Sequence, residues 1–131
     1  MDRTINQLQK ELKISSLQGA PIIAAGAIYF AVLFVLSFII EPRILELIWV
    51  IGLGVIFPLG MLIARLLGAD IFVKGNSLGA LAGIVGGIQA LYIPVYIVAY
   101  KFFPEWLPFF VGTMTAAHFI PYIWLYRSKV Y

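Results

Sequence analysis

Few side chains in this 131-residue chain can do chemistry, and they lie within long apolar stretches. His118 is the single histidine, and Gln89 is the most polar residue of its own stretch. The two are about equally far along the chain from the polar segment 101–106, so antiparallel helices joined there would hold them at one depth. Tyr92 and Tyr96 follow Gln89 at helical spacing. These four residues form a candidate polar pocket.

Two interpretations of this candidate pocket stay open. In the first, His118 and Gln89 form a structural clasp, because a polar side chain in lipid is usually hydrogen-bonded to a neighbouring helix. We favour it because His118 has no charged partner at its depth. In the second, the residues line a hydrated pathway in which His118 binds a solute or carries a proton.

The arrangements that catalysis and metal binding need are missing from the sequence. There is no cysteine, and one histidine is too few for a metal site. No carboxylate lies at the depth of His118 to orient it as a general base, and no GxxxxGK phosphate-binding motif occurs. We therefore expect a protein that is not an enzyme, with no catalytic residue, no metal and no cofactor.

The composition indicates a membrane protein. Apolar residues make up 63% of the chain and charged residues 11%, against about 45–50% and about 25% in soluble domains. So apolar a surface would aggregate in water but is compatible with lipid. In this setting the net charge of +3 is a topology signal and does not indicate nucleic-acid binding.

The apolar stretches predict an all-α polytopic membrane protein. A spanning helix needs about 20 apolar residues, and short connections make successive helices antiparallel. We expect an up-down bundle, with residues 20–131 as the transmembrane domain and residues 1–19 as a separate leading segment. The four predicted spans are residues 20–40, 44–67, 78–100 and 107–126.

The distribution of Lys and Arg predicts the orientation of this bundle. One side of the membrane receives seven of these residues: Arg3, Lys10, Lys13, Arg65, Lys74, Arg127 and Lys129. The other side receives only Arg43 and Lys101. By the positive-inside rule, both termini are cytoplasmic and the protein lies in the cell (inner) membrane.

The segment 1–19 has an amphipathic pattern. Ile5, Leu8 and Leu12 share a helical face, and Thr4 with Gln7 fits a capping box. We expect either a short amphipathic helix on the inner membrane surface or a solvated leader that directs topology. Docking on a partner is a third, less favoured alternative.

Glycines and prolines in the spans predict the helix packing. Small residues at four-residue spacing let helices approach closely, and the partner is either another helix of this chain or a second copy. The glycines concerned are Gly79, Gly83, Gly86 and Gly87. A proline inside a helix removes a backbone donor and causes a kink, which we expect at Pro58, Pro94 and Pro121.

Three segments resemble a bacterial family of uncharacterised multi-pass membrane proteins, classed as a domain of unknown function. They are FPLGMLIARLLGAD (57–70), NSLGALAGIVGGIQALYIPV (76–95) and TAAHFIPYIWLYRSKVY (115–131). They look like the family pattern FPL, NPLG and GAHFxPYxWxY. The resemblance places Gln89 and His118 in that pattern, while Ser77 stands where the family tends to have Pro. Members of that family continue past the equivalent of Tyr131, so this chain is expected to be a short form.

The sequence as a whole favours a small integral membrane protein that either self-associates or serves as an accessory subunit. The expected partners are the lipid bilayer and either further copies of the chain or a larger membrane assembly, and not nucleic acid. The alternative function is a transporter or channel for a small solute, built around Gln89 and His118.

Overall fold

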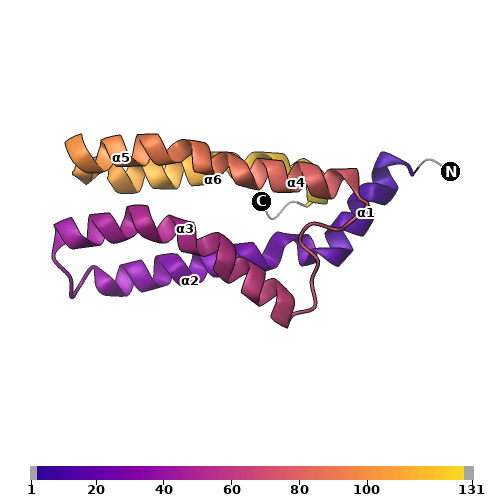
Figure 1. Cartoon of the computed structure of the whole chain (residues 1–131), viewed down its shortest axis with the longest axis horizontal. Helices are drawn as coiled ribbons and strands as arrows, with labels where there is room; N and C mark the ends of the chain where they lie inside the picture. The colour runs from indigo at the N-terminus through magenta and orange to yellow at the C-terminus, as the bar shows by residue number, and fades with distance from the viewer. Residues whose placement is uncertain (1–2, 129–131) are drawn as a thin grey trace.

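The computed structural model describes residues 3–128, and all regular structure in that range is helical (Figure 1). Lys129 and Tyr131, which entered the predictions above, lie outside the described residues. The elements are α1 (Ile5–Ser15), η1 (Leu17–Gly19), α2 (Ala20–Leu36), α3 (Pro42–Leu66), α4 (Ser77–Gly87), η2 (Ile88–Tyr92), α5 (Ile93–Phe102), η3 (Pro104–Trp106) and α6 (Leu107–Tyr126).

Helices α2 and α3 form an antiparallel hairpin with the most extensive contact in the molecule. Pro21 and Pro42 lie in the first turns of the two helices, where the missing N–H of proline has no intrahelical partner to lose. A close approach at Gly60 of α3 brings Ile22 of α2 against its backbone. The Tyr29 hydroxyl donates to the Trp49 carbonyl at 2.8 Å, which ties the same two helices together.

The predicted third span is interrupted in the structure. α4 ends at Gly87, and five residues of 3₁₀ helix, η2, connect it to α5. Pro94 lies in the first turn of α5 and has no N–H to donate to the Ala90 carbonyl, which instead accepts from the Ile93 N–H. Thus the proline starts a new helix after a tightened turn, whereas Pro58 and Pro121 lie inside continuous helices.

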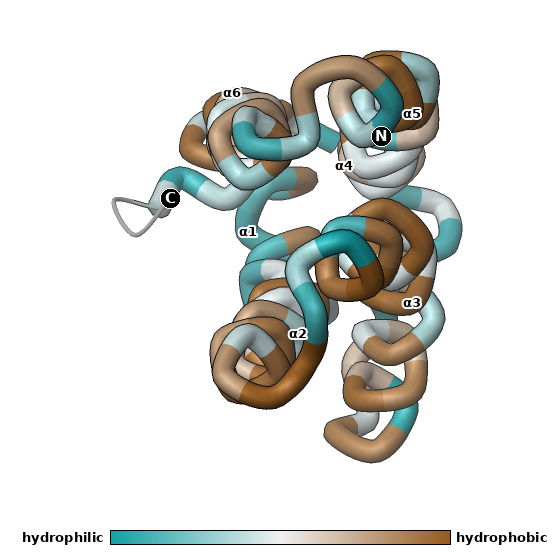
Figure 2. Tube along the Cα trace, turned by 90° about the vertical axis from the view of Figure 1, so that its left-hand side faces the viewer, coloured by the Kyte–Doolittle hydropathy of each residue, from teal (hydrophilic) through white to brown (hydrophobic). Residues whose placement is uncertain are grey.

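Three helices are long and apolar enough to cross a membrane: Leu17–Leu36, Pro42–Leu66 and Ser77–Phe102. This agrees with the predicted membrane protein, and the mostly apolar colouring of α2 and α3 is visible in Figure 2. α6 is 20 residues long but is not among them. Prolines and His118 lower its mean hydropathy, so a fourth span is not confirmed.

The buried side chains form two clusters at opposite ends of the molecule. One joins α5 and α6 to the α2–α3 hairpin and contains Tyr96, Ala99, Leu107 and Val111. The other contains Leu12, Val73, Ala82, Leu125 and Tyr126, and it holds α1 against α4 and α6. The bundle is therefore fastened near its two ends.

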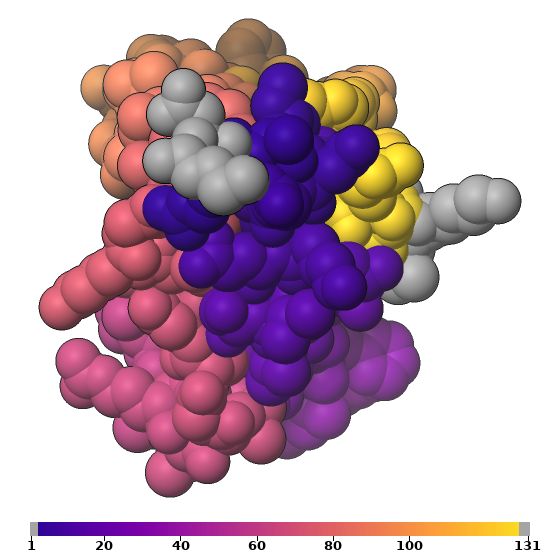
Figure 3. All heavy atoms as spheres, turned by 90° about the vertical axis from the view of Figure 1, so that its right-hand side faces the viewer, coloured from indigo at the N-terminus to yellow at the C-terminus, as the bar shows by residue number. Residues whose placement is uncertain are grey.

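Helix α1 has the predicted capping box, in which Thr4 and Gln7 bond reciprocally. It lies across one end of the molecule, between the end of α6 and the chain that leads into α4 (Figure 3). Leu12 is fully buried there and Gln9 is 4% exposed. Of the predicted apolar face, Leu12 is thus buried within the chain and Leu8 is partly buried, while Ile5 stays exposed.

Candidate functional site

Gln89 and His118 lie side by side, one in η2 and the other in α6. The His118 Nδ1 is 2.6 Å from the Thr115 carbonyl oxygen. The Gln89 amide nitrogen lies 2.9 Å from Nδ1 and 3.0 Å from the other ring nitrogen, Nε2. Because the Thr115 carbonyl can only accept, Nδ1 carries the proton, and Nε2 is the ring nitrogen that can accept from the Gln89 amide. His118 is 8% exposed. The pair joins η2 to α6, and both ring nitrogens of His118 have a hydrogen-bond partner.

The tyrosines of the predicted pocket extend this polar band. Tyr92 and Tyr96 pack edge to face with ring centroids 6.4 Å apart, and Tyr96 is buried beside Thr115. The Thr115 hydroxyl is itself buried, and the Tyr96 side chain is its polar neighbour. On the other side of His118, Tyr122 donates to the Ala82 carbonyl at 2.7 Å. The structure thus brings the predicted pocket residues into one packed band between η2, α5 and α6.

Two cavities lie elsewhere on the surface, and neither is lined by Gln89, His118, Tyr92 or Tyr96. A small one of about 320 Å³ is lined by apolar residues of α5 and α6 around Phe103 and Phe110. The larger, of about 860 Å³, is a groove between α1 and the last turns of α6. No three His, Cys, Asp or Glu residues within 3–128 are grouped so that they could hold a metal ion.

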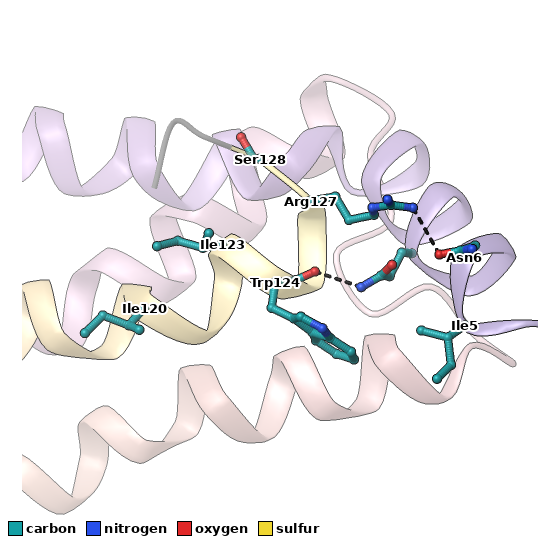
Figure 4. Close-up of a pocket in the computed structure, with 8 residues that line it drawn as sticks. Ile5, Asn6, Ile120, Ile123, Trp124, Arg127 and Ser128 are labelled. Atoms are coloured by element: carbon teal, nitrogen blue, oxygen red, sulfur yellow. Dashed lines mark hydrogen bonds between the residues drawn. The ribbon is translucent and has the colours of Figure 1, made fainter.

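The groove between α1 and α6 has a polar end and an apolar wall (Figure 4). The Arg127 guanidinium reaches across to Asn6 of α1 and donates to its side-chain oxygen at 3.0 Å. The Gln9 amide donates to the Trp124 carbonyl at 2.8 Å, which fixes α1 to α6 at the base of the groove. Ile120 and Ile123 continue the wall along α6.

A second set of hydrogen bonds holds α1 to the start of α4. The Asn76 side chain caps α4 by accepting from the Leu78 N–H at 2.9 Å. Its amide group also donates to the Leu8 carbonyl at 2.9 Å and to the Glu11 carboxylate at 2.8 Å. Glu11 in turn pairs with Arg3 at 2.9 Å. Asn76 is 4% exposed, so these bonds are largely shielded from water.

The four glycines of the predicted third span do not share one packing partner. A methyl group at Gly79 would overlap the Phe72 carbonyl, and one at Gly86 would lie 3.1 Å from the Tyr122 hydroxyl. Gly83 faces the Phe72 ring at an ordinary 3.5 Å, and Gly87 has nothing within 4 Å. Gly79 and Gly83 thus face the loop that follows α3, and Gly86 faces α6. Gly87 faces outward.

A family model matches residues 5–131 of the chain. The chain belongs to a family of unknown function (DUF7010). This agrees with the predicted resemblance to a family of unknown function, while the match itself does not establish the multi-pass character or the sequence pattern expected from that resemblance. No curated protein and no solved structure matches the chain.

The contacts that the sequence did not predict lie where α1 docks on α4 and α6. Asn76 was noted only as part of a pattern, although an Asn immediately before an apolar helical run is a typical N-cap. Nothing in the sequence indicated the contacts of Gln9 and Asn6, and Arg127 was identified only as a topology-determining cation, because their bonds join segments more than a hundred residues apart. Their role depends on the tertiary docking of α1.

Removing both members of the Gln89–His118 pair should destabilise the fold by less than the two single losses added together. Gln89→Leu and His118→Leu each leave a polar partner unsatisfied in an apolar interior, at about 1–3 kcal/mol. The double variant removes both polar groups, so its loss should be smaller than the sum by about 1 kcal/mol. Unfolding of the four proteins in detergent, followed by circular dichroism, measures this coupling. Strictly additive losses would contradict the clasp.

Proposed function

We propose that this protein is a small, non-enzymatic membrane protein with four spans, which acts by self-association or as an accessory subunit of a membrane assembly. The observation that carries the proposal is that polar side chains inside the bundle form hydrogen bonds from one helix to another. Tyr29, Gln89 and Tyr122 each make a hydrogen bond to a neighbouring helix. Such bonds support packing, while the apolar surface is left to lipid or to other spans.

The fourth span of this proposal is α6. It has 20 residues, about 30 Å of helix, and no Asp, Glu, Lys or Arg between Leu107 and Tyr126. It packs along α5 as the second arm of a hairpin. The connection between α5 and α6 is short, so if α5 crosses the bilayer, α6 must cross it in the opposite direction.

The proposed orientation places α1 on the cytoplasmic side. The end of the molecule that carries α1 also carries the loop after α3 and the end of α6 (Figure 1). Six of the seven cations assigned to that side lie within the described residues. Arg43 lies in the first turn of α3 and Lys101 in the last turn of α5, and these two helix ends are at the opposite end of the molecule (Figure 1). The positive-inside rule favours cytoplasmic termini and the cell membrane for this distribution.

Self-association is proposed through the outward face of α4. Gly87 is exposed and open, and on the same face Ala80 and Ile84 are also exposed. Glycine on a lipid-facing surface lets a second backbone approach. The transport alternative is supported by a different observation, the buried Thr115 hydroxyl beside Tyr96 and His118, but His118 lines neither the α1–α6 groove nor the cavity around Phe103.

Single cysteines test the proposed contact, because the natural chain has none. Gly87→Cys should form disulfide-linked dimers in native membranes when an oxidant is added. Gly54→Cys and Gly112→Cys are matched controls, since each replaces an exposed helical glycine with nothing within 4 Å. They should remain monomeric in the same assay. A specific α4 contact would be contradicted if all three variants formed dimers, or if none of them did.

A further inference from the structure

The groove between α1 and α6 has the shape and polarity of an amphiphile site. Ile120, Ile123 and Trp124 lie on one face of α6, and they are 65%, 43% and 52% exposed. Arg127 follows at the end of the same face. The wall therefore runs from apolar side chains within the helix to a cation at its end, as Figure 4 shows.

Arg127 is the group that would select the head of such an amphiphile. A guanidinium has five N–H donors in a planar fork that matches a phosphate. The structure shows one side-chain bond for it, to Asn6, which orients the group and leaves other donors without a protein partner among residues 3–128. None of the residues that line the groove is acidic. Charge complementarity thus favours an anion.

The backbone geometry at this end shows that the position of Arg127 is imposed by the fold. Its φ is +46°, in the left-handed region that glycine usually occupies at the end of a helix. Such a conformation costs about 1–2 kcal/mol in a residue with a side chain. The bond to Asn6 and the docking of α1 hold it in place.

We propose that the groove binds an acidic phospholipid of the bilayer, with its phosphate on Arg127 and an acyl chain along Ile120 and Ile123. The proposal rests on the proposed function, because it requires α6 to cross the membrane with Arg127 at the interface. Basic pockets beside spanning helices on the cytoplasmic side are typical sites for acidic lipid headgroups. α1 forms the wall opposite α6 and so would sense whether the site is filled.

Trp124 provides a local probe of this site. A protein with Trp49→Phe and Trp106→Phe keeps Trp124 as its only tryptophan. After reconstitution in phosphatidylcholine vesicles, brominated phosphatidylglycerol or brominated phosphatidylcholine is added as a fluorescence quencher. We expect phosphatidylglycerol to associate about fivefold more strongly than phosphatidylcholine, the preference expected for one interfacial cation.

Two arginines at the same end of the molecule allow a matched comparison. Arg127→Gln should abolish the preference, whereas Arg65→Gln, at the end of α3, should keep it although it removes the same charge. Arg127→Lys should retain most of it. Equal quenching by both lipids in the single-tryptophan protein with Arg127 intact, or loss of preference in Arg65→Gln as well, would overturn the site. Absence of quenching by either lipid would overturn the membrane insertion of α6, and the site with it.

Discussion

Replacing Gly60 by valine should destabilise the protein by about 3 kcal/mol, at the upper end of the usual effect of overpacking. A side chain at Gly60 would overlap Ile22 Cδ1 and lie 3.0 Å from Ile22 Cα. The first contact is with the flexible end of a side chain, but the second is with backbone, which moves only if α2 moves. The α2–α3 hairpin is the most extensive contact of the fold, so its separation would weaken the whole bundle.

Gly54 is the matched control in the same helix. It is exposed, and a side chain there would meet nothing within 4 Å. Gly54→Val should therefore change the free energy of unfolding by no more than about 0.5 kcal/mol. Thermal or denaturant unfolding of both variants in one detergent, followed by circular dichroism, gives the comparison. Equal stability of the two would show that the hairpin does not depend on the close approach at Gly60.

Replacing Asn76 by alanine should release α1 from the end of the bundle. The substitution removes the N-cap of α4, at about 1 kcal/mol, and two hydrogen bonds to α1, at about 1 kcal/mol each. The α1 amides should then exchange with solvent about thirtyfold faster, the factor that corresponds to the roughly 2 kcal/mol of the two lost bonds to α1. Hydrogen exchange read by mass spectrometry over residues 5–15 measures it.

Asn76→Asp separates the two roles of this side chain. The new carboxylate still accepts from the Leu78 N–H, so the cap of α4 is kept. It loses both donors and faces the Glu11 carboxylate, so α1 should be released as in the alanine variant. Asn6→Ala removes one exposed bond and should leave α1 protected. Continued protection of α1 in Asn76→Asp would contradict the proposed attachment.

Local patterns predicted the features that depend on neighbours in sequence. The capping box of Thr4 and Gln7 is present because it needs only four successive residues. Gln89 and His118 meet because equal spacing from a short connection gives equal depth in an antiparallel hairpin. The interruption at Pro94 follows from its missing N–H, although the sequence predicted a kink where the structure begins a new helix.

The sequence by itself determined that the chain forms apolar helices, roughly where they lie, and which side chains share a depth. The tertiary structure decided which glycines are in close contact, where α1 docks, and that a groove with Arg127 exists. The reason is rotation about the helix axis: α2 is apolar on all sides, so no water-facing stripe indicates its inner face. The close approach at Gly60 and the bonds of Asn76 depend on such rotations, and on the packing of segments far apart in the chain.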